Sequence, residues 1–399
     1  MKKVLLLLVS LSFIYSVNAQ KFVWDKLNSG ISSGNLYDIK FVNDSVGMAI
    51  GNDGSINFVL KTTDGGLNWN NVATASIDQL VRACDFVDVN NVFIVGRKGG
   101  LYKSIDGGQS WSKLNLGTNV DLIDISSPDA KAIYICTAGG RYINYDGVGW
   151  ATKTVYSADD FVAVGFPTKN EGFLTATNGR VWRTSDGGDT WDTVKTDQES
   201  ILGSHFITYN VGYVVGGKGM VKRTINGGIN WSDTLIYPED YKNIDFRAVS
   251  FPLQNFGFIG GNNGTILRTA DGGSNWIQEI TNITDKIYKI DAPSITSAFA
   301  VGENGIILKR RDASSIHEND FNTINIYPNP ATSVLHIVHT VTHEQAQISI
   351  YNLNGKEVLH STLTKGNNHQ LDISGLTQGL YLIKLLSDES SSWGKVLIK

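Results

Sequence analysis

Short apolar runs alternate with glycine-containing turns along the first three quarters of the chain. One stretch shows the order well: apolar segments over 246–251 and 256–260, an Asn-Asn-Gly turn, and a third segment over 265–268. An Asp-Gly-Gly turn follows, and Trp276 opens a fourth segment. Short apolar runs bounded by turn residues are typical of β-strands. Four antiparallel strands in about 40 residues predict the blade of a β-propeller.

One turn motif marks this repeat. Its first copy reads Lys-Thr-Thr-Asp-Gly-Gly-Leu-Asn-Trp and ends at Trp69, and the copies recur at intervals of 40 to 45 residues. The turn positions are Asp64, Asp106, Asp146, Asp186, Asn226 and Asp271, and the matching tryptophans are Trp69, Trp111, Trp150, Trp191, Trp231 and Trp276. The copy at Asp146 reaches its Trp one residue early, and a last copy at Asp312 lacks both the glycines and the Trp. Counting it, the spacing predicts seven blades.

The composition of the turn points to a structural role. We expect the carboxylate to accept hydrogen bonds from N–H groups one or two residues ahead, while the two glycines tolerate positive φ. The Trp then packs its apolar face against the turn. The alternative is an Asp that acts as a metal ligand or catalytic acid, but seven similar copies on a rim cannot share one active centre.

The two ends of the repeat complement each other. No Trp strand follows Asp312, whereas Phe22-Val23-Trp24-Asp25-Lys26-Leu27 resembles a fourth strand with no turn before it. We therefore expect the strand of Trp24 to complete the seventh blade beside Ile306 to Lys309, which leaves the ring no unpaired edge.

Composition and the N-terminus bound the class of protein. Lys2 and Lys3 precede an apolar stretch and a Val-Asn-Ala sequence, which predicts a signal peptide over 1–19, cut between Ala19 and Gln20. The apolar run is too short to span a membrane, and no transmembrane segment is expected elsewhere. A net charge of −4 disfavours nucleic acid as a partner. We expect Cys84 and Cys136 to be buried free thiols, with a disulfide as the less favoured alternative.

The periodicity stops near Asp312, and a different pattern begins at residue 324. Alternating strand-like segments separated by glycine turns fill residues 324–399 and predict a small immunoglobulin-like β-sandwich. The expected organisation is a signal peptide over 1–19, an all-β propeller over 20–312, a linker over 313–323 and a C-terminal domain over 324–399.

Both parts resemble known families. The Ser/Thr-x-Asp-x-Gly-x-x-Trp motif, as in Thr62 to Trp69, resembles the Asp-box, also called the BNR repeat, and residues 22–312 resemble the photosystem II stability and assembly factor propellers. That resemblance implies the fold more than the function, because Asp-boxes also occur in sialidases, xyloglucan hydrolases and sortilin-like receptors. It implies no photosynthetic role for a secreted chain.

The segment from Ile324 to Lys399 resembles the type A C-terminal sorting domain of the type IX secretion system. This resemblance implies Sec-dependent export and then passage across the outer membrane through the type IX machinery, with release or attachment at the cell surface. A permanent adhesive module is the alternative interpretation of the tail.

Candidate chemistry within the ring is sparse. The ring contains one histidine, His205, which disfavours a histidine triad or a multi-histidine metal site, so no metal or cofactor is expected. Five arginines outside the repeated position could converge on one face and hold an acidic protein or glycan. They are Arg82, Arg97, Arg141, Arg180 and Arg247. Separate solvated arginines are the alternative.

The sequence predicts a non-enzymatic propeller, expected as a monomer, that binds a glycan or protein at the cell surface. The second hypothesis is a glycoside hydrolase with its acids on loops at the channel mouth. Its candidate acids are Asp160, Asp245, Asp285 and Glu303, although their spacing marks no pair. A third hypothesis is an assembly chaperone for another surface protein.

Overall fold

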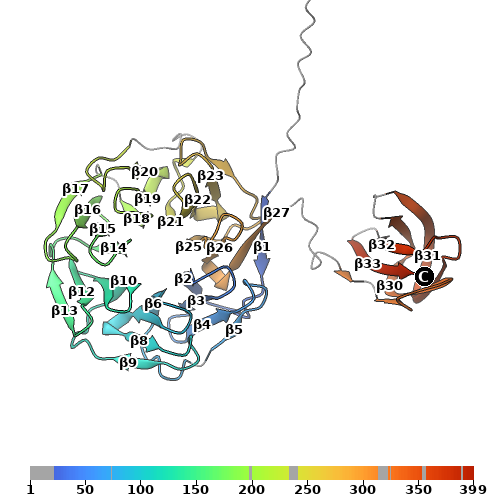
Figure 1. Cartoon of the computed structure of the whole chain (residues 1–399), viewed down its shortest axis with the longest axis horizontal. Coiled ribbons are helices and arrows are strands. Elements are labelled where there is room, and N and C mark those ends of the chain that lie inside the picture. Colours follow the sequence, from blue (N-terminus) through green and yellow to red (C-terminus); the bar gives the residue numbers. More distant parts are fainter. Residues whose placement is uncertain are drawn as a thin grey trace, which may run out of the picture. The chain divides into compact units, whose positions relative to one another are not determined.

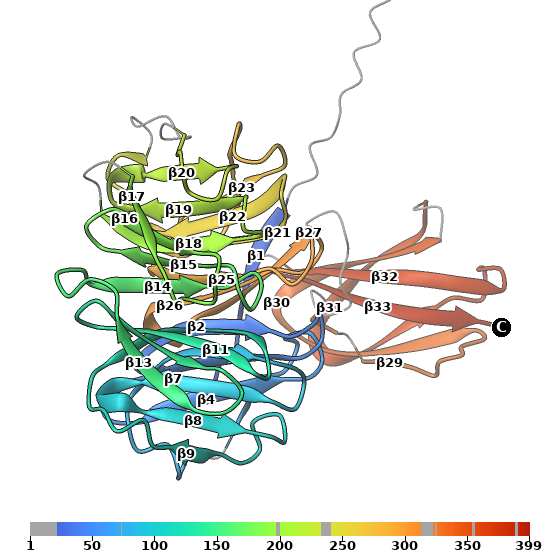
Figure 2. The same cartoon turned by 60° about the vertical axis from the view of Figure 1, so that its left-hand side comes forward.

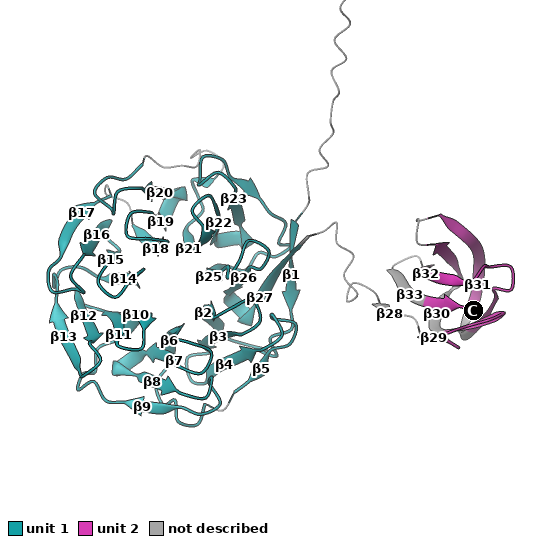
Figure 3. Cartoon of the chain, viewed as in Figure 1, with its two compact units in different colours: residues 1–314 teal, residues 315–399 magenta. Residues whose placement is uncertain are grey.

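The computed structural model describes residues 22–72, 74–196, 200–232, 241–312, 322–323, 325–352, 356–387 and 390–399. The chain divides into two compact units, residues 1–314 and 315–399 (Figure 3). The predicted signal peptide, its cleavage site at Ala19 and Gln20, and most of the predicted linker lie outside the described residues. Each unit is described by itself below.

The first unit is a ring of seven antiparallel sheets, numbered here as blades 1 to 7 in chain order (Figure 1). Blade 1 comprises β2 (Asn35–Phe41), β3 (Gly47–Asn52), β4 (Asn57–Thr62) and β5 (Asn70–Asn71). Blade 2 comprises β6 (Val81–Phe86), β7 (Val92–Gly96), β8 (Leu101–Ser104) and β9 (Ser112–Leu114). Blade 3 comprises β10 (Leu122–Asp129), β11 (Ala132–Thr137), β12 (Arg141–Tyr145) and β13 (Trp150–Thr154). Blade 4 comprises β14 (Phe161–Gly165), β15 (Gly172–Ala176), β16 (Arg180–Thr184) and β17 (Asp192–Lys195). Blade 5 comprises β18 (Ile201–Phe206), β19 (Gly212–Gly216) and β20 (Val221–Thr224). Blade 6 comprises β21 (Phe246–Leu253), β22 (Phe256–Gly261), β23 (Ile266–Thr269) and β24 (Ile277–Gln278). Blade 7 comprises β25 (Ile287–Asp291), β26 (Phe299–Gly302), β27 (Ile307–Asp312) and β1 (Phe22–Leu27). The predicted all-β, seven-bladed propeller is confirmed.

Four blades carry a short 3-10 turn between their second and third strands. These turns are η1 (Arg97–Gly99), η2 (Gly217–Gly219), η3 (Asn262–Gly264) and η4 (Glu303–Gly305). The middle residue of each adopts positive φ, as at Lys98 with φ 51°. The turns lie on the face of the ring where the innermost strands begin, because β-strand pairing places the end of the second strand beside the start of the first.

The ring closes through its two ends, as the sequence predicts. Strand β1 pairs antiparallel with β27, placing Trp24 opposite Arg310 (Figure 1). Trp24 is 2% exposed, and its indole Nε1 donates a 2.8 Å hydrogen bond to Glu279. The Trp24 amide donates to the Ile280 carbonyl at 2.8 Å, which ties blade 7 to blade 6. The last sheet therefore combines residues from both termini of the ring.

The apolar core of the ring is divided among the contacts between blades. One buried cluster lies between each pair of neighbouring blades, giving seven clusters in the part of the ring that the structure describes. In several of them an aromatic ring of one blade stacks on the next, as Phe173 does on Phe206 with ring centroids 3.7 Å apart. The Asp-box Trp of the following blade in each such pair then packs edge-on against this stack, as Trp231 of blade 5 does against Phe206 with ring centroids 6.3 Å apart. Each blade is thus stabilised by its neighbours.

The Asp-box turns satisfy their own polar groups, over a longer reach than expected. In blade 4, Asp186 accepts hydrogen bonds from the Thr184 hydroxyl at 2.7 Å and from the Thr190 amide at 3.0 Å. The Thr184 hydroxyl oxygen accepts from the Gly188 amide at 2.9 Å. The carboxylate therefore reaches four residues ahead, because the two glycines turn the chain back beneath it. The eroded turn at Asp146 comes nearer to the expectation, since its carboxylate accepts from the amides two and three residues ahead.

The C-terminal unit is β-rich, as predicted. Its sheet has the order β28 (Asn322–Thr323), β33 (Ser390–Ile398), β32 (Gly379–Ser387), β30 (Val334–Asn352) and β29 (Asn325–Tyr327), with β31 (Glu357–Asp372) paired to β30. Figure 2 shows the long strands β32 and β33 side by side, in agreement with their antiparallel register. One cluster that includes Ile348, Ile383 and Val396 forms its core.

Both cysteines are buried free thiols, as the sequence favours. Cys84 belongs to the cluster between blades 1 and 2, and Cys136 belongs to the one between blades 3 and 4. Burial raises the pKa of both thiols, so they stay protonated and unreactive at neutral pH.

Candidate functional site

A repeated β-bulge builds the mouth of the central channel. In every innermost strand the pairing register shifts by one residue near the strand start, as at Tyr37 between the pairs Leu36–Gly51 and Asp38–Ile50. A bulge turns a side chain away from its regular direction. The extra residues are Tyr37, Arg82, Ile123, Val162, Leu202, Arg247 and Tyr288. All seven line one cavity of about 190 Å³, called the mouth cavity here.

The mouth cavity combines two guanidinium groups with a pair of tyrosine rings. Arg82 is exposed and has no hydrogen-bond or ion-pair partner among the described residues. Arg247 lies 3.5 Å from Asp245, and its Nε is buried without a partner. The rings of Tyr37 and Tyr288 stack with centroids 5.7 Å apart. The rim thus offers unused hydrogen-bond donors with positive charge beside an aromatic surface.

Charged side chains lie directly below the rim. Lys289 Nζ is 3.6 Å from Asp38 and 4.0 Å from Asp124, on three different innermost strands. Burial raises the pKa of Asp38 to about 6, against the lowering effect of Lys289. Burial would lower the pKa of Lys289, but the charges of Asp38 and Asp124 outweigh it and raise that pKa. Lys289 therefore stays protonated in the channel.

A second cavity of about 180 Å³ continues the channel below this level. Here Lys40 lies 3.6 Å from Asp85, and Asp291 and His205 are among the other polar residues of the lining. Burial raises the pKa of Asp291. Burial also lowers the pKa of His205 to about 3, and Lys40 and Lys289 act in the same direction. His205 is thus neutral at physiological pH.

The channel carboxylates link neighbouring blades. Asp38 accepts a 2.8 Å hydrogen bond from the Cys84 amide of the next blade, and Asp124 accepts one of 3.0 Å from the Val164 amide. Asp291 closes the circle by accepting from the Phe41 amide at 2.7 Å. Innermost strands have no strand beyond them, so their inward amides need side-chain acceptors. These acids therefore have a structural explanation.

Two of the five predicted arginines meet in one site. Arg82 and Arg247 line the mouth cavity, whereas Arg97, Arg141 and Arg180 do not. Arg180 instead forms a 3.0 Å ion pair with Asp159 and lies over the ring of Tyr156. Arg97 begins η1 and Arg141 begins β12, both exposed to solvent.

The acids of the glycosidase hypothesis lie outside the mouth cavity. Asp245 contacts Arg247, and Asp285 accepts a 2.6 Å hydrogen bond from the Asn304 side chain. Glu303 forms a 2.9 Å ion pair with Lys286, whose hydrogen bond lowers the Glu303 pKa. Asp160 is exposed. Over the described ranges, no three His, Cys, Asp or Glu side chains are placed to hold a metal ion, and no helix has the length and apolarity to cross a bilayer.

Comparison with protein families decides the relationship of the ring. The family model of the photosynthesis system II assembly factor YCF48 matches residues 16–148 and 194–313, together more than half of the chain. The chain belongs to this YCF48 family. The secretion system C-terminal sorting domain matches residues 325–399. The protein is therefore a YCF48-type propeller with a type IX sorting tail, which directs export to the cell surface or beyond.

Individual YCF48 proteins show how far the similarity extends. The photosystem II assembly lipoprotein Ycf48 of Synechococcus sp. (strain CC9902) is 26% identical over 166 residues, which are 41% of this chain and 38% of that protein. A solved structure of YCF48 bound to D1 peptide has a TM-score of 0.62 at 20% identity, covering 72% of this chain and 94% of its own. YCF48 from Cyanidioschyzon merolae has a TM-score of 0.60 at 18% identity, covering 72% and 98%. At these identities the solved structures show the fold.

The sequence interpretation missed most of the mouth of this YCF48-family ring. It included Arg82 and Arg247 among five candidate arginines but did not consider Tyr37, Tyr288 or Lys289. A signal was available, since Tyr37 and Tyr288 occupy the same repeat position as the two arginines. The bulge itself has no motif, so nothing in the sequence shows that this position faces the channel.

Proposed function

We propose that this protein is an exported binding protein whose mouth cavity holds an acidic segment of a partner protein. The observation that carries the proposal is the pair of guanidinium groups with unused donors, on Arg82 and on Arg247. Guanidinium groups bind carboxylates through paired, charge-assisted hydrogen bonds. The stacked Tyr37 and Tyr288 add an apolar surface for the ligand chain.

A protein ligand is favoured over a glycan by the relatives. A YCF48 structure is described as bound to D1 peptide, and a peptide carries both carboxylates and apolar side chains to such a rim. An acidic glycan shares the charge and is the second outcome of the test below. The hydrolase hypothesis is less supported, because Asp245, Asp285 and Glu303 already have partners.

The proposal includes the route to the surface. The N-terminal 19 residues would direct Sec export, and the mature chain would begin at Gln20. The sorting tail would engage the type IX machinery, so that the propeller meets its partner outside the outer membrane. Residues 313–323 would serve as the linker between the propeller and the tail.

The test compares matched arginine variants of the mature full-length chain. Peptides rich in Asp and Glu, peptides with Asn and Gln in their place, and an array of uronic and sulfated glycans are titrated by fluorescence anisotropy. We expect acidic peptides to bind and Arg82→Gln with Arg247→Gln to weaken binding at least tenfold, with a strong dependence on salt. Arg141→Gln serves as control, since Arg141 lies outside the cavity. Equal binding by the double variant, or binding of glycans alone, would contradict the proposal.

A further inference from the structure

Comparison of the seven blades reveals one position where a cationic side chain is missing. The third strand of most blades carries Lys or Arg directly before the Ser or Thr that begins the Asp-box. In the strand pairing, this cation lies opposite the same position of the second strand, as Arg183 does opposite Phe173 and Arg223 opposite Tyr213. The cations are Lys61, Lys103, Arg183, Arg223, Arg268 and Lys309. Blade 3 has Asn144 in this register, opposite Tyr134.

In three of these blades the cation reaches the Asp-box of the following blade. Arg183 Nη1 donates a 3.3 Å hydrogen bond to the carbonyl of Gly227, the first glycine of the next box. Arg223 Nη1 lies 3.0 Å from the position that a Cβ on Gly272 would take, and Lys61 Nζ lies 2.8 Å from that of Gly107. The cation therefore occupies the same place at three contacts between blades.

The contact between blades 5 and 6 is a close reference for the one between blades 3 and 4. In the reference, the Tyr213 hydroxyl donates to the carbonyls of Gln254 at 3.2 Å and Gly272 at 3.0 Å. The Arg223 guanidinium lies 5.8 Å from the centroid of the Tyr213 ring. This arrangement packs one guanidinium between an aromatic ring and the glycine turn.

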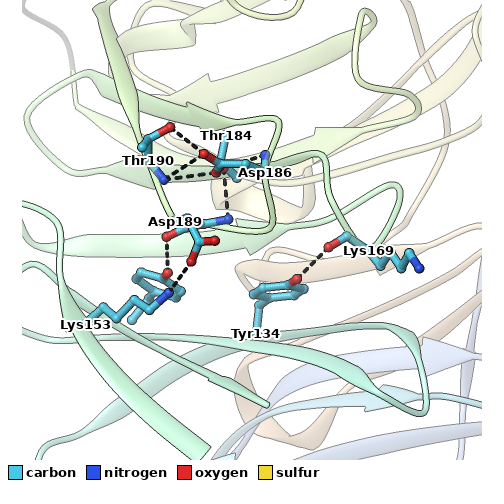
Figure 4. A network of polar contacts seen from close by, with 9 residues as sticks. Tyr134, Lys153, Lys169, Thr184, Asp186, Asp189 and Thr190 are labelled. Carbon is cyan, nitrogen blue, oxygen red and sulfur yellow. Dashed lines mark hydrogen bonds and ion pairs between the residues drawn. The ribbon is translucent and has the colours of Figure 1, made fainter. Parts of the chain in front are cut away.

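Between blades 3 and 4 the same frame lacks the guanidinium. The Tyr134 hydroxyl donates to the Lys169 carbonyl at 2.6 Å, as Tyr213 does to Gln254 (Figure 4). The atoms nearest to a Cβ on Gly187 are that hydroxyl and that carbonyl, both 3.5 Å away, and no cation is among them. Asn144 is too short to reach the turn, and its buried Oδ1 has no partner.

A cavity of about 380 Å³ lies at this place, within the range of roughly 300–1,000 Å³ usual for ligand pockets. Its lining includes Tyr134, Asn144 and Gly187. Three of the charged residues that line the cavity are already engaged: Lys153 pairs with Asp189 at 2.8 Å, and Asp186 is held inside its own box (Figure 4). Lys131 and Lys169 also line the cavity. Figure 4 also shows the Lys169 side chain extending away from Tyr134. Two hydrogen-bond acceptors at the cavity could therefore receive a donor: the side-chain amide oxygen of Asn144 and the backbone carbonyl of Gly187.

We propose that this cavity is a socket for the guanidinium group of an arginine side chain from a partner protein. The incoming group would lie over Tyr134 and donate to Asn144 Oδ1 and to the Gly187 carbonyl, as Arg183 donates to Gly227 within the chain. This arginine socket is separate from the mouth cavity, since the two share no lining residue. The protein would therefore present an acceptor site for a cation in addition to its arginine-lined mouth.

The test uses Asn144→Arg, which would supply the missing side chain from within the chain. The probe is Nα-acetyl-L-arginine amide, with the neutral citrulline analogue as its control, and the readout is the Tm of the mature full-length protein over a probe titration. We expect the arginine probe to raise the wild-type Tm in a saturable way and citrulline to raise it less. Asn144→Arg should melt roughly 2 °C higher without probe and lose the response.

Two further variants complete the design. Arg82→Gln, at the mouth, should keep the full response to the arginine probe. Arg223→Asn copies blade 3 into blade 5 and should add a second saturable response, which keeps the test decisive even if Asn144→Arg fails to fold. The proposal is overturned if arginine and citrulline give equal shifts, if Asn144→Arg folds and retains the wild-type response, or if Arg223→Asn folds and gains none.

Discussion

At the scale of single residues, the Asp-box shows how one side chain holds a turn. Asp186 accepts from the Thr184 hydroxyl and from both the amide and hydroxyl of Thr190. We expect Asp186→Ala to lower the Tm by roughly 2–3 °C, because these donors lose their acceptor. The matched control is Asp146→Ala, since Asp146 binds only the amides of its own short turn. Differential scanning calorimetry should show a clearly smaller decrease in Tm for the control. Equal decreases would contradict the conclusion that the hydrogen bonds that Asp186 accepts from Thr190, four residues ahead, stabilise the turn.

The same carboxylates predict how stability depends on acid. The Asn68 amide donates to Asp64, and this bond, against a smaller effect of burial, lowers the pKa of Asp64 to about 2 from an ordinary value of 3.8. A lowered folded-state pKa stabilises the fold above the unfolded-state pKa, and this contribution disappears as the pH falls from about 4 toward 2.

Asp64→Asn tests this sign directly. The side chain of Asn226 already fills the same role in blade 5, accepting from the Asn230 amide at 3.0 Å without a titrating group. We therefore expect Asp64→Asn to fold normally and to lose less Tm between pH 5 and pH 3 than the wild type does. Thermal melts at the two pH values measure the difference. A variant that is as acid-sensitive as the wild type would show that Asp64 does not contribute to the acid response.

At the scale of strands, the channel acids replace the backbone partners that innermost strands lack. Asp124 joins β10 to β14 through the Val164 amide and also lies 4.0 Å from Lys289. Asp124→Ala should cost about 1–3 kcal/mol, because it leaves a buried amide unsatisfied. Asp124→Asn retains an acceptor and should recover part of that loss, whereas Asp160→Ala on the exposed loop should have little effect. Urea unfolding of the three variants gives the comparison, and a neutral Asp124→Ala would contradict the link between blades.

Repeated elements were the predictable part of the structure, and exceptions within them were the unpredictable part. The seven-fold period, the fourth strand at Trp24 and the sorting tail all depend on spacing and residue type, which the sequence displays directly. The bulge that turns Tyr37 and Tyr288 into the channel arises from strand twist and pairing, and it has no residue signature. The missing cation at Asn144 could be recognised only once the structure showed which side chains of the third strands face the next blade. Sequence could therefore locate Arg82 and Arg247 but could not tell that Arg97, Arg141 and Arg180 lie elsewhere.

At the scale of the whole ring, seven small clusters replace a single core, so stability depends on the circle being closed. The closing contact is concentrated at Trp24, which packs edge-on against Phe258 at 5.7 Å and donates to Glu279. Glu279 in turn binds Arg310 through two hydrogen bonds of 2.8 and 2.9 Å. The first and last strands of the ring thus share one buried polar group as well as their backbone pairing.

Loss of this contact should weaken every blade together. We expect Trp24→Ala to cost about 3–5 kcal/mol and to preserve a single cooperative transition, because an opened ring exposes the β27 edge and two blade faces at once. Trp24→Phe keeps most of the apolar burial but removes the donor to Glu279, so it should cost less. Trp150→Ala removes the partly exposed indole of the eroded box and serves as a control of matched chemistry outside the closure. Urea unfolding followed by both far-ultraviolet circular dichroism and tryptophan fluorescence measures the losses. If Trp24→Ala cost no more than Trp150→Ala, or if the two signals separated into independent transitions, closure by the N-terminal strand would not be what unites the ring.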